Sequence, residues 1–216
     1  DKLTKEQLEI LPTSYDVIGS ILIFIDFPKE LKKKEKIIAQ TVLDKLPNIK
    51  TILKKTKKHS GKYRLPKYKF LAGIKTFETI YRENNIRLKL NIKKVYFSPR
   101  SSTERTRIYN LVKNRESVLV MFSGSAIYPL VISKNSKPHE AQGIEINPTA
   151  HKFALQNVEL NKLNNIFLHK GNVNKILPKL NKKFDRILMP LPMGAEKYLQ
   201  LALKYVKDNG TIHFYY

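Results

Sequence analysis

A glycine and a glutamate stand 21 residues apart in the second half of the chain, each at the end of a predicted strand. The run Phe122-Ser123-Gly124-Ser125-Ala126 closes the apolar stretch Ser117–Phe122, and its small residues would let the backbone approach a ligand. A carboxylate at Glu145 can hold both ribose hydroxyls of an adenosine. Although the three-glycine dinucleotide fingerprint is absent, this spacing predicts a nucleoside-containing cofactor. The alternative for Glu145 is a contact that caps the following helix.

The composition excludes several other kinds of chemistry. The chain has no cysteine, which removes disulfides, thiol nucleophiles and cysteine-ligated zinc. Its histidines lack the spacing of metal ligands, so no metal site is expected, and His213 is expected to pack beside a sheet. The five histidines are His59, His139, His151, His169 and His213.

Positive charge is concentrated in one part of the chain. The formal net charge is +23 over 216 residues, and residues 51–100 hold 15 Lys or Arg against 2 acidic residues. Such a patch favours binding of a polyanion, because cations displace counterions from phosphates and aromatic rings stack on unpaired bases. A lysine-rich surface that is merely solvated is the alternative, since Lys outnumbers Arg 33 to 8. The aromatic residues interleaved with this charge are Tyr63, Tyr68, Phe70, Phe77 and Tyr81.

The first part of the chain, residues 1–94, is predicted to form a small basic α/β domain. Its expected elements are a helix at Lys5–Ile10, a strand at Val17–Phe27, a basic amphipathic helix at Lys29–Leu46, a strand at Ile49–Leu53, a basic loop or ribbon at Lys54–Lys69, and a hairpin of Thr76–Tyr81 and Ile86–Leu90 around Asn84-Asn85.

From about residue 105, predicted strands alternate with predicted helices. This alternation predicts a doubly wound parallel sheet, whose ligand lies beyond the carboxyl ends of the strands. The expected helices are Thr106–Val112, Pro148–Asn161, Val173–Leu180 and Ala195–Val206, and the expected strands are Ser117–Phe122, Gln142–Ile146, Ile166–His169, Asp185–Leu188 and Gly210–Tyr216.

The sequence shows no sign of a membrane-spanning segment or of a signal peptide. The most apolar early stretch, Ile21–Ile25, is interrupted by Asp26, and the N-terminal residues do not resemble a signal peptide. We therefore expect a cytoplasmic protein with no membrane partner. Because the basic face disfavours self-association, a monomer is expected.

The run Val95-Tyr96-Phe97-Ser98-Pro99-Arg100-Ser101-Ser102-Thr103-Glu104-Arg105 resembles the signature that precedes the Rossmann domain in archaeal and eukaryotic tRNA (guanine-37 N1)-methyltransferases. The resemblance implies a Rossmann-type class I methyltransferase domain over residues 95–216, preceded by a small basic domain that faces tRNA. It implies S-adenosylmethionine as methyl donor and the anticodon stem-loop of tRNA as partner, with the guanosine 3′ of the anticodon as target. Further runs match in order, covering nearly the whole chain: Ser14–Gly19, Gly61–Arg64, Gly143–Pro148, Asn157–Lys162 and Gly210–Tyr215.

The resemblance also implies roles for single residues. Glu104 would be the general base that removes the guanine N1 proton, provided that desolvation raises its pKa toward neutrality. Arg64 would stabilise charge on the guanine O6. A solvated ion pair is the alternative for Glu104 and Arg105. The implied pocket comprises Tyr96, Arg100 and Arg105, then Phe122, Ser123 and Gly124, with Glu145 and Ile146 at the ribose, Asn172 and Val173 at the adenine, and Pro190, Leu191 and Pro192 at the target base.

The chain departs from the family pattern in four respects. Val120 and Ala126 replace an acidic residue and a glycine, and Asn172 stands where the family commonly has Asp. The Asn-Leu-Pro motif that touches the target base reads Pro190-Leu191-Pro192, which removes an amide donor and acceptor. This change resembles the archaeal dual-function branch, which also methylates carbon 7 of the wyosine precursor 4-demethylwyosine. Fourth, the sheet stops at about its fifth strand and no tRNA-elbow domain precedes it, which suggests a fragment or a pared-down version.

Two other functions remain open at this stage. The first is the aminocarboxypropyl transferase of the wyosine pathway, which cleaves another bond of the same cofactor. The second is a non-catalytic RNA-binding module with a decayed Rossmann domain, which the departures at Val120, Ala126 and Asn172 would fit. Retention of Glu104 and Arg64 favours methyl transfer.

Overall fold

The computed structural model describes residues 3–61, 63–191 and 193–215, with the side chains of this part except those of residues 57–60. The chain separates into two compact units, Asp1–Tyr81 with Leu90–Pro99, and Arg82–Lys89 with Arg100–Tyr216. The hairpin near residue 85 thus contributes to both units, a division that differs from a single boundary after residue 94. No helix in the described part is both long and apolar enough to cross a bilayer.

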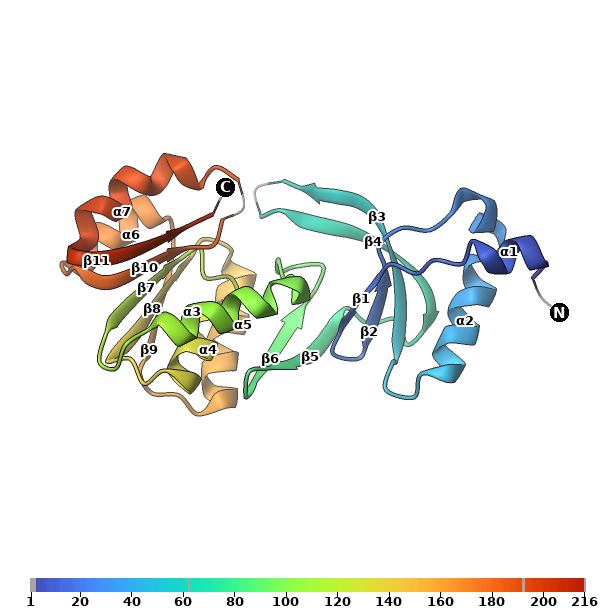
Figure 1. Cartoon of the computed structure of the whole chain (residues 1–216), viewed down its shortest axis with the longest axis horizontal. Helices are drawn as coiled ribbons and strands as arrows, with labels where there is room; N and C mark the ends of the chain where they lie inside the picture. Colours follow the sequence, from blue (N-terminus) through green and yellow to red (C-terminus); the bar gives the residue numbers. More distant parts are fainter. Residues whose placement is uncertain (1–2, 62, 192, 216) are drawn as a thin grey trace. The chain divides into compact units, whose positions relative to one another are not determined.

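The first unit packs helix α2 on a four-stranded sheet of order β1-β2-β3-β4 (Figure 1). Strand β3 runs parallel to β2 and antiparallel to β4. The core between sheet and helix includes Leu22, Ile52, Leu71 and Ile38. The elements are α1 (Lys5–Glu9), β1 (Tyr15–Ile18), β2 (Ile21–Phe24), the 3-10 helix η1 (Lys29–Lys34), α2 (Glu35–Lys45), β3 (Thr51–Ser60) and β4 (Leu65–Gly73).

Two sequence expectations for this unit were wrong in detail. The strand expected over Val17–Phe27 is instead the antiparallel hairpin β1–β2. Gly19 makes the break, because its φ of 57° lies in the left-handed region and a Cβ there would fall 2.2 Å from the Thr79 hydroxyl oxygen. The helix expected from Lys29 begins as 3-10 turns and becomes α-helical only at Glu35.

The expected ribbon and hairpin are both confirmed. Strand β3 pairs with β2 only over Thr51–Lys54, so the rest of β3 and its partner β4 form a two-stranded ribbon. Strands β5 (Glu78–Glu83) and β6 (Ile86–Asn91) meet at Asn84 and Asn85, whose φ angles are 42° and 62°. Two successive positive φ angles are typical of the type I′ turn, for which asparagine is well suited.

The second unit is built on a five-stranded, fully parallel sheet of order β11-β10-β7-β8-β9. The doubly wound Rossmann-type fold is therefore confirmed. Helix α5 occupies the predicted residues, since Asn147 caps it and Pro148 starts it. The elements are η2 (Pro99–Ser101), α3 (Ser102–Leu111), β7 (Ser117–Met121), α4 (Ile127–Asn135), β8 (Glu140–Glu145), α5 (Pro148–Asn161), β9 (Ile166–Lys170), α6 (Val173–Ile176), η3 (Leu177–Leu180), β10 (Phe184–Met189), η4 (Ala195–Tyr198), α7 (Leu199–Tyr205) and β11 (Val206–Phe214).

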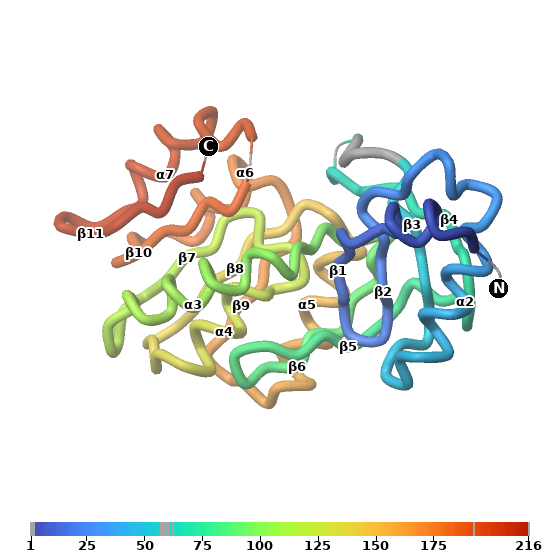
Figure 2. Tube along the Cα trace, turned by 45° about the vertical axis from the view of Figure 1, so that its right-hand side comes forward, coloured from blue at the N-terminus to red at the C-terminus, as the bar shows by residue number. Residues whose placement is uncertain are grey.

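Helices cover both faces of this sheet. The chain steps from β7 outward to β9 and then crosses to β10 and β11, and right-handed crossovers place the two sets of helices on opposite faces. Helices α3, α4 and α5 pack in sequence on one face, and α6 and α7 lie on the other (Figure 2). The reversal occurs between β7 and β10, the point at which doubly wound sheets bind ligands.

Two asparagines of α5 bind the backbone of strand β6. Asn157 is fully buried; its Oδ1 accepts from the Lys89 N–H at 2.7 Å and its Nδ2 donates to the Lys89 carbonyl at 2.9 Å. One helical turn later, Asn161 makes the same pair of bonds to Arg87, at 2.8 and 2.6 Å. The rise of one helical turn approximates the distance between alternate strand residues, so the two amides act as a substitute for a neighbouring strand. The Asn157–Lys162 run thus has a structural purpose within the second unit.

Replacing Asn157 by Ala should lower the free energy of unfolding by about 2–4 kcal/mol, because it leaves the N–H and C=O of Lys89 without partners. Urea denaturation measures this change. Asn161→Ala, at a more exposed position, should cost less, and Asn164→Ala on the exposed turn after α5 serves as the matched control. Equal effects of all three substitutions would contradict the structural role of Asn157.

Candidate functional site

The loop after β7 has an unusual backbone. Phe122, Gly124 and Ala126 have φ angles of 59°, 57° and 68°, all in the left-handed region. This conformation is uncommon for an aromatic residue, and such strain is typical of loops shaped around a ligand. The Ala126 N–H donates to the Ser123 carbonyl at 2.9 Å, which closes the turn before α4. Ala126 replaces a glycine of the family pattern, and glycine adopts the left-handed conformation of this position without steric cost.

Glu145, the last residue of β8, links the loop after β7 to the loop after β8. Its side chain is buried, and its Oε2 accepts from the Gly124 N–H at 2.7 Å while its Oε1 accepts from the Asn147 N–H at 2.6 Å. Burial raises the pKa of the Glu145 carboxyl, and the backbone donors oppose that rise. Each carboxylate oxygen has a second lone pair, so both oxygens can accept a further hydrogen bond from a ligand hydroxyl. The bond to Asn147, the N-cap of α5, is the contact at the start of the following helix that the sequence offered as the alternative for Glu145.

Ser123 supplies a polar group that the protein itself does not use. Its hydroxyl oxygen is buried and has no hydrogen-bond partner within the described residues. Gly143 on β8 makes room for it, because a Cβ at Gly143 would fall 2.9 Å from that oxygen. A buried hydroxyl without a partner is costly, and a bound polar molecule would satisfy it.

The loops after β9 and β10 reach the same edge of the sheet. The Gly171 N–H donates to the Glu145 carbonyl at 2.9 Å, and Asn172 caps α6 through a bond from the Asn174 N–H. Val173 is buried. The structure therefore brings the predicted residues Phe122, Ser123, Gly124, Glu145, Ile146, Asn172 and Val173 to one edge of the sheet.

Pro190 and Leu191 follow the last residue of β10 at this same edge. The Leu191 N–H donates to the Met189 carbonyl at 2.7 Å, which makes Pro190 the centre of a three-residue turn. The fixed φ of proline is close to what an inverse γ-turn requires. Pro192, the third residue of the predicted base-contacting motif, lies outside the described residues.

Glu104 lies in the first turn of α3 and is bound by two other side chains. Arg107 donates to both carboxylate oxygens, with Nε to Oε2 and Nη2 to Oε1 each at 2.7 Å, and the Tyr215 hydroxyl donates to Oε1 at 2.7 Å. The Arg107 hydrogen bond is the main cause that holds the pKa of Glu104 below its usual value. The expected rise of this pKa through desolvation is therefore not what the structure shows.

The remaining predicted residues fall into three settings. Arg105 does not line an open pocket: its side chain is buried, and Nε and Nη2 donate to Glu83 at 2.5 and 2.6 Å. This correction has a simple cause, since a buried guanidinium needs a carboxylate partner. Arg100 is exposed just before α3. Arg64, at the turn between β3 and β4 with a φ of 51°, and Tyr96, 37% exposed, belong to the first unit.

Sequence reasoning missed the partners of Glu104. The spacing of Glu104 and Arg107 is a known signal for an ion pair on one helix face, so that contact could have been found. Tyr215 is 111 residues away, and no local pattern points to it. Within the described residues, no group of three or more His, Asp or Glu side chains could hold a metal ion.

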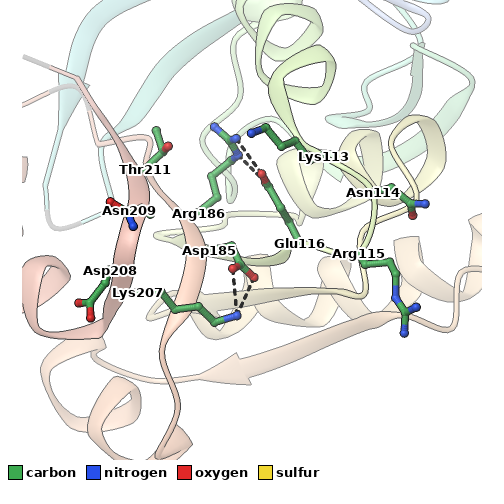
Figure 3. A pocket seen from close by; sticks show the side chains of 11 residues that line it. Lys113, Asn114, Arg115, Glu116, Asp185, Arg186, Lys207, Asp208, Asn209 and Thr211 are labelled. Carbon is green, nitrogen blue, oxygen red and sulfur yellow. Dashed lines mark hydrogen bonds and ion pairs between the residues drawn. The ribbon is translucent and has the colours of Figure 1, made fainter.

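The second unit also has a hollow at the amino edge of its sheet, opposite the carboxyl edge. It is lined by residues around the amino ends of β7, β10 and β11, including Lys113, Arg115 and Thr211 (Figure 3). Its charges largely neutralise one another, because Arg186 binds Glu116 and Lys207 binds Asp185. Doubly wound sheets bind ligands at the carboxyl edge, so this polar hollow is a poor candidate for the active site.

Two family models match the chain: the TYW2 N-terminal domain over residues 1–76 and the TRM5/TYW2 methyltransferase domain over residues 79–216. The tRNA (guanine(37)-N(1))-methyltransferase Trm5b of Pyrococcus abyssi is 39% identical over 98% of this chain and 62% of its own length. The tRNA (guanine(37)-N(1))/4-demethylwyosine(37)-methyltransferase Taw22 of Nanoarchaeum equitans is 34% identical over 94% of this chain and 83% of its own.

Solved structures agree with these matches. The complex of aTrm5 with tRNALeu has a TM-score of 0.86 at 33% identity, covering 97% of this chain and 61% of that one. The structure of Methanocaldococcus jannaschii TYW2 in complex with AdoMet has a TM-score of 0.68 at 26% identity, covering 93% and 75%. The chain thus spans about three fifths of the Pyrococcus relative. Because the methyltransferase-domain model alone covers well over half of the chain, this protein belongs to the TRM5/TYW2 methyltransferase family.

Proposed function

We propose that this chain carries the catalytic part of a tRNA methyltransferase. The reaction transfers a methyl group from S-adenosylmethionine to N1 of the guanosine at position 37, directly 3′ of the anticodon. The single observation that carries the proposal is the carboxyl-edge site, in which the buried Glu145 carboxylate binds the Gly124 N–H beside a strained loop. Relatives at 39% and 34% identity are named for this same reaction.

The residues at the carboxyl edge fit the adenosine end of that cofactor. Glu145 would accept the ribose hydroxyls, Ser123 offers an unused buried hydroxyl, and Val173 offers an apolar contact for the adenine. When bound, S-adenosylmethionine supplies a methyl group on a positively charged sulfur, and a nucleophile takes that methyl as neutral S-adenosylhomocysteine departs. The relative from Methanocaldococcus jannaschii was solved in complex with AdoMet.

Glu104 is proposed to take the proton that guanine N1 must lose when it gains the methyl group. Its low pKa keeps it ionised at neutral pH, so it is ready to accept a proton. The same low pKa makes it a weak base, and a base near neutrality transfers protons more effectively. Position must therefore contribute more than basicity. Arg64, always charged and held in a turn of the first unit, is proposed to stabilise charge on the guanine O6.

The first unit offers a surface for RNA. No acidic residue occurs between Asp44 and Glu78, a stretch with 11 Lys or Arg. Two of these, Lys54 and Lys69, bind the buried Glu35. On the ribbon of β3 and β4, a hollow is lined by Thr56, Leu65, Pro66, Lys67, Tyr68 and Lys93.

This hollow combines the groups that hold a nucleotide of an RNA chain. Burial raises the pKa of Tyr68, so its hydroxyl stays protonated and can donate to a phosphate oxygen. Lys67 and Lys93 bring two positive charges, and Lys93 already lies 4.2 Å from the centre of the Phe77 ring. Cations of this kind bind phosphate independently of sequence. We propose that the hollow contacts the tRNA backbone.

The double substitution of Lys67 and Lys93 by Ala should weaken tRNA binding about tenfold at moderate salt. It should also reduce the steepness of the plot of log binding constant against log salt concentration by about one to two. Binding curves at several salt concentrations measure both effects. The exposed pair Lys32 and Lys36 of the same unit, changed together to Ala, is the matched control. An equal loss in the control would mean that the unit binds RNA by diffuse charge without using the hollow.

A second substrate is proposed from the loop after β10. Pro190 sits where the family commonly has an asparagine, and its ring can neither donate nor accept a hydrogen bond through a side chain. Carbon 7 of 4-demethylwyosine is a carbon nucleophile that needs no amide at N1 and belongs to a bulkier base. We propose that the chain also methylates this carbon; the name of the Nanoarchaeum equitans relative gives 4-demethylwyosine(37) as a second substrate of that protein.

Incubation with labelled S-adenosylmethionine and two tRNAs, one with guanosine and one with 4-demethylwyosine at position 37, should give a methylated nucleoside from both. Glu104→Gln should reduce the guanosine reaction by at least about a hundredfold, the usual scale for loss of a general base. Methyl on guanosine alone would refute the second substrate. An aminocarboxypropyl product, or no product with unimpaired tRNA binding, would replace the proposal by one of the two alternative functions.

Pro190→Asn should raise the yield of N1-methylguanosine relative to the carbon-7 product several-fold, because it restores an amide donor and acceptor at the base. Nucleoside analysis of a competition between the two tRNAs gives this ratio directly. The control is Pro178→Asn, in the 3-10 helix η3. An unchanged ratio would separate Pro190 from substrate choice and leave it as a turn residue.

A further inference from the structure

We propose that Tyr215 is the positioning residue of Glu104, binding the first turn of α3 to the carboxyl edge of the sheet, with Arg107 as a second, more mobile holder. This inference rests on the proposed role of Glu104 as the base. Neither Tyr215 nor Arg107 belongs to the residues to which the family resemblance assigns a role.

Tyr215 lies at the end of the last strand of the sheet. It directly follows Phe214, the last residue of β11, and Phe214 pairs with Met189, the last residue of β10. Tyr215 therefore stands at the carboxyl edge of the sheet, on which Gly124, Glu145 and Pro190 also lie. Since its hydroxyl lies 2.7 Å from the Glu104 Oε1, this bond places the proposed base at the same edge as the cofactor site.

The donors to Glu104 are shared unequally between its two carboxylate oxygens. Among the described residues, Oε1 accepts from both Tyr215 and Arg107, whereas Oε2 accepts from Arg107 alone. An oxygen with two lone pairs and one donor can accept another hydrogen, so Oε2 is the atom left to receive a proton. The Tyr215 bond thus decides which oxygen remains available.

Arg107 and Tyr215, the two residues that bind Glu104, differ in their exposure to solvent. The Arg107 side chain is 53% exposed, and an exposed ion pair on one helix contributes little to rigidity. Tyr215 is half-buried, and burial raises its pKa so that it remains a donor. The tyrosine is the fixed partner, and the arginine can leave when substrate enters.

The surroundings add no competing charge change near neutral pH. His213 on β11 faces the same cluster; burial lowers its pKa to about 4, so it is neutral and accepts from Arg186 of β10 at 2.7 Å. Arg186 is in turn bound by Glu116. From the α3 side, Arg105 is bound by Glu83 of the β5–β6 hairpin, and Tyr128 of α4 has a raised pKa and stays neutral. His213 and Tyr128 are therefore both neutral near neutral pH, and neither adds a change of charge there.

The test compares Tyr215→Phe with Arg107→Met in the full chain. Both changes remove a donor that lowers the pKa of Glu104, so both should raise that pKa, measured by 13C NMR of labelled glutamate. A base must be deprotonated to act, so the rate of methyl transfer falls as pH drops through this pKa, and the acidic limb should move to higher pH in both variants.

The two variants should differ at a pH where Glu104 is fully ionised. There, Tyr215→Phe should reduce single-turnover methyl transfer about tenfold with unchanged KM for tRNA and cofactor, because the base is no longer held in position. Arg107→Met should reduce it less than Tyr215→Phe does, because the exposed ion pair holds the base less firmly. Tyr205→Phe, on α7, is the matched control.

The outcomes separate this inference from the proposed function. An unmoved Glu104 pKa in Tyr215→Phe, or an unchanged rate at high pH, would overturn the positioning role even if Glu104→Gln is inactive. A fully active Glu104→Gln enzyme would instead refute the base itself, whatever Tyr215 does to the pKa of Glu104.

Discussion

The buried carboxylate of Glu145 is the constraint on which the candidate site depends. A charge at this depth is tolerated only if hydrogen-bond donors surround it, and the donors are the backbone N–H groups of Gly124 and Asn147. Because these two amides belong to the loops after β7 and β8, satisfying one side chain fixes two of the segments that form the carboxyl edge. The left-handed backbone at Phe122 and Ala126 lies on either side of Gly124, whose amide this loop brings to the carboxylate.

Much of this arrangement could be predicted from local sequence, because local rules set it. Helix α5 begins where predicted because Asn147 is its N-cap and Pro148 its first residue. The turn of the β5–β6 hairpin lies at Asn84-Asn85, as predicted, because asparagine tolerates positive φ. The strand expected over Val17–Phe27 failed for a tertiary reason. At Gly19 the chain turns close to Thr79 and Ile80 of β5. These residues are about 60 positions away in the sequence, so the local pattern around Gly19 does not predict the contact.

The residues of the candidate site show where such prediction stops. Gly124 and Glu145 were found together because parallel strands place their carboxyl ends at one edge, whatever lies between them. Arg105 and Glu104 are neighbours in one motif, yet the structure buries Arg105 against Glu83 and leaves Glu104 partly exposed against Arg107 and Tyr215. Which face of α3 is covered depends on the β5–β6 hairpin and on the residue after β11, and neither is encoded in the motif itself.

The carboxylates of Glu145 and Glu104 have opposite environments, and this opposition fits two different roles. Burial raises the pKa of Glu145, whereas the hydrogen bonds of Arg107 and Tyr215 lower that of Glu104. A buried carboxylate that resists charge is stabilised by a cationic ligand and by neutral hydroxyl donors, and the proposed cofactor carries both. A partly exposed carboxylate held ionised can instead take a proton from a substrate and pass it to water. Pairs of acids whose surroundings separate their pKa values in this way are typical of active sites in which each carboxyl group has a different role.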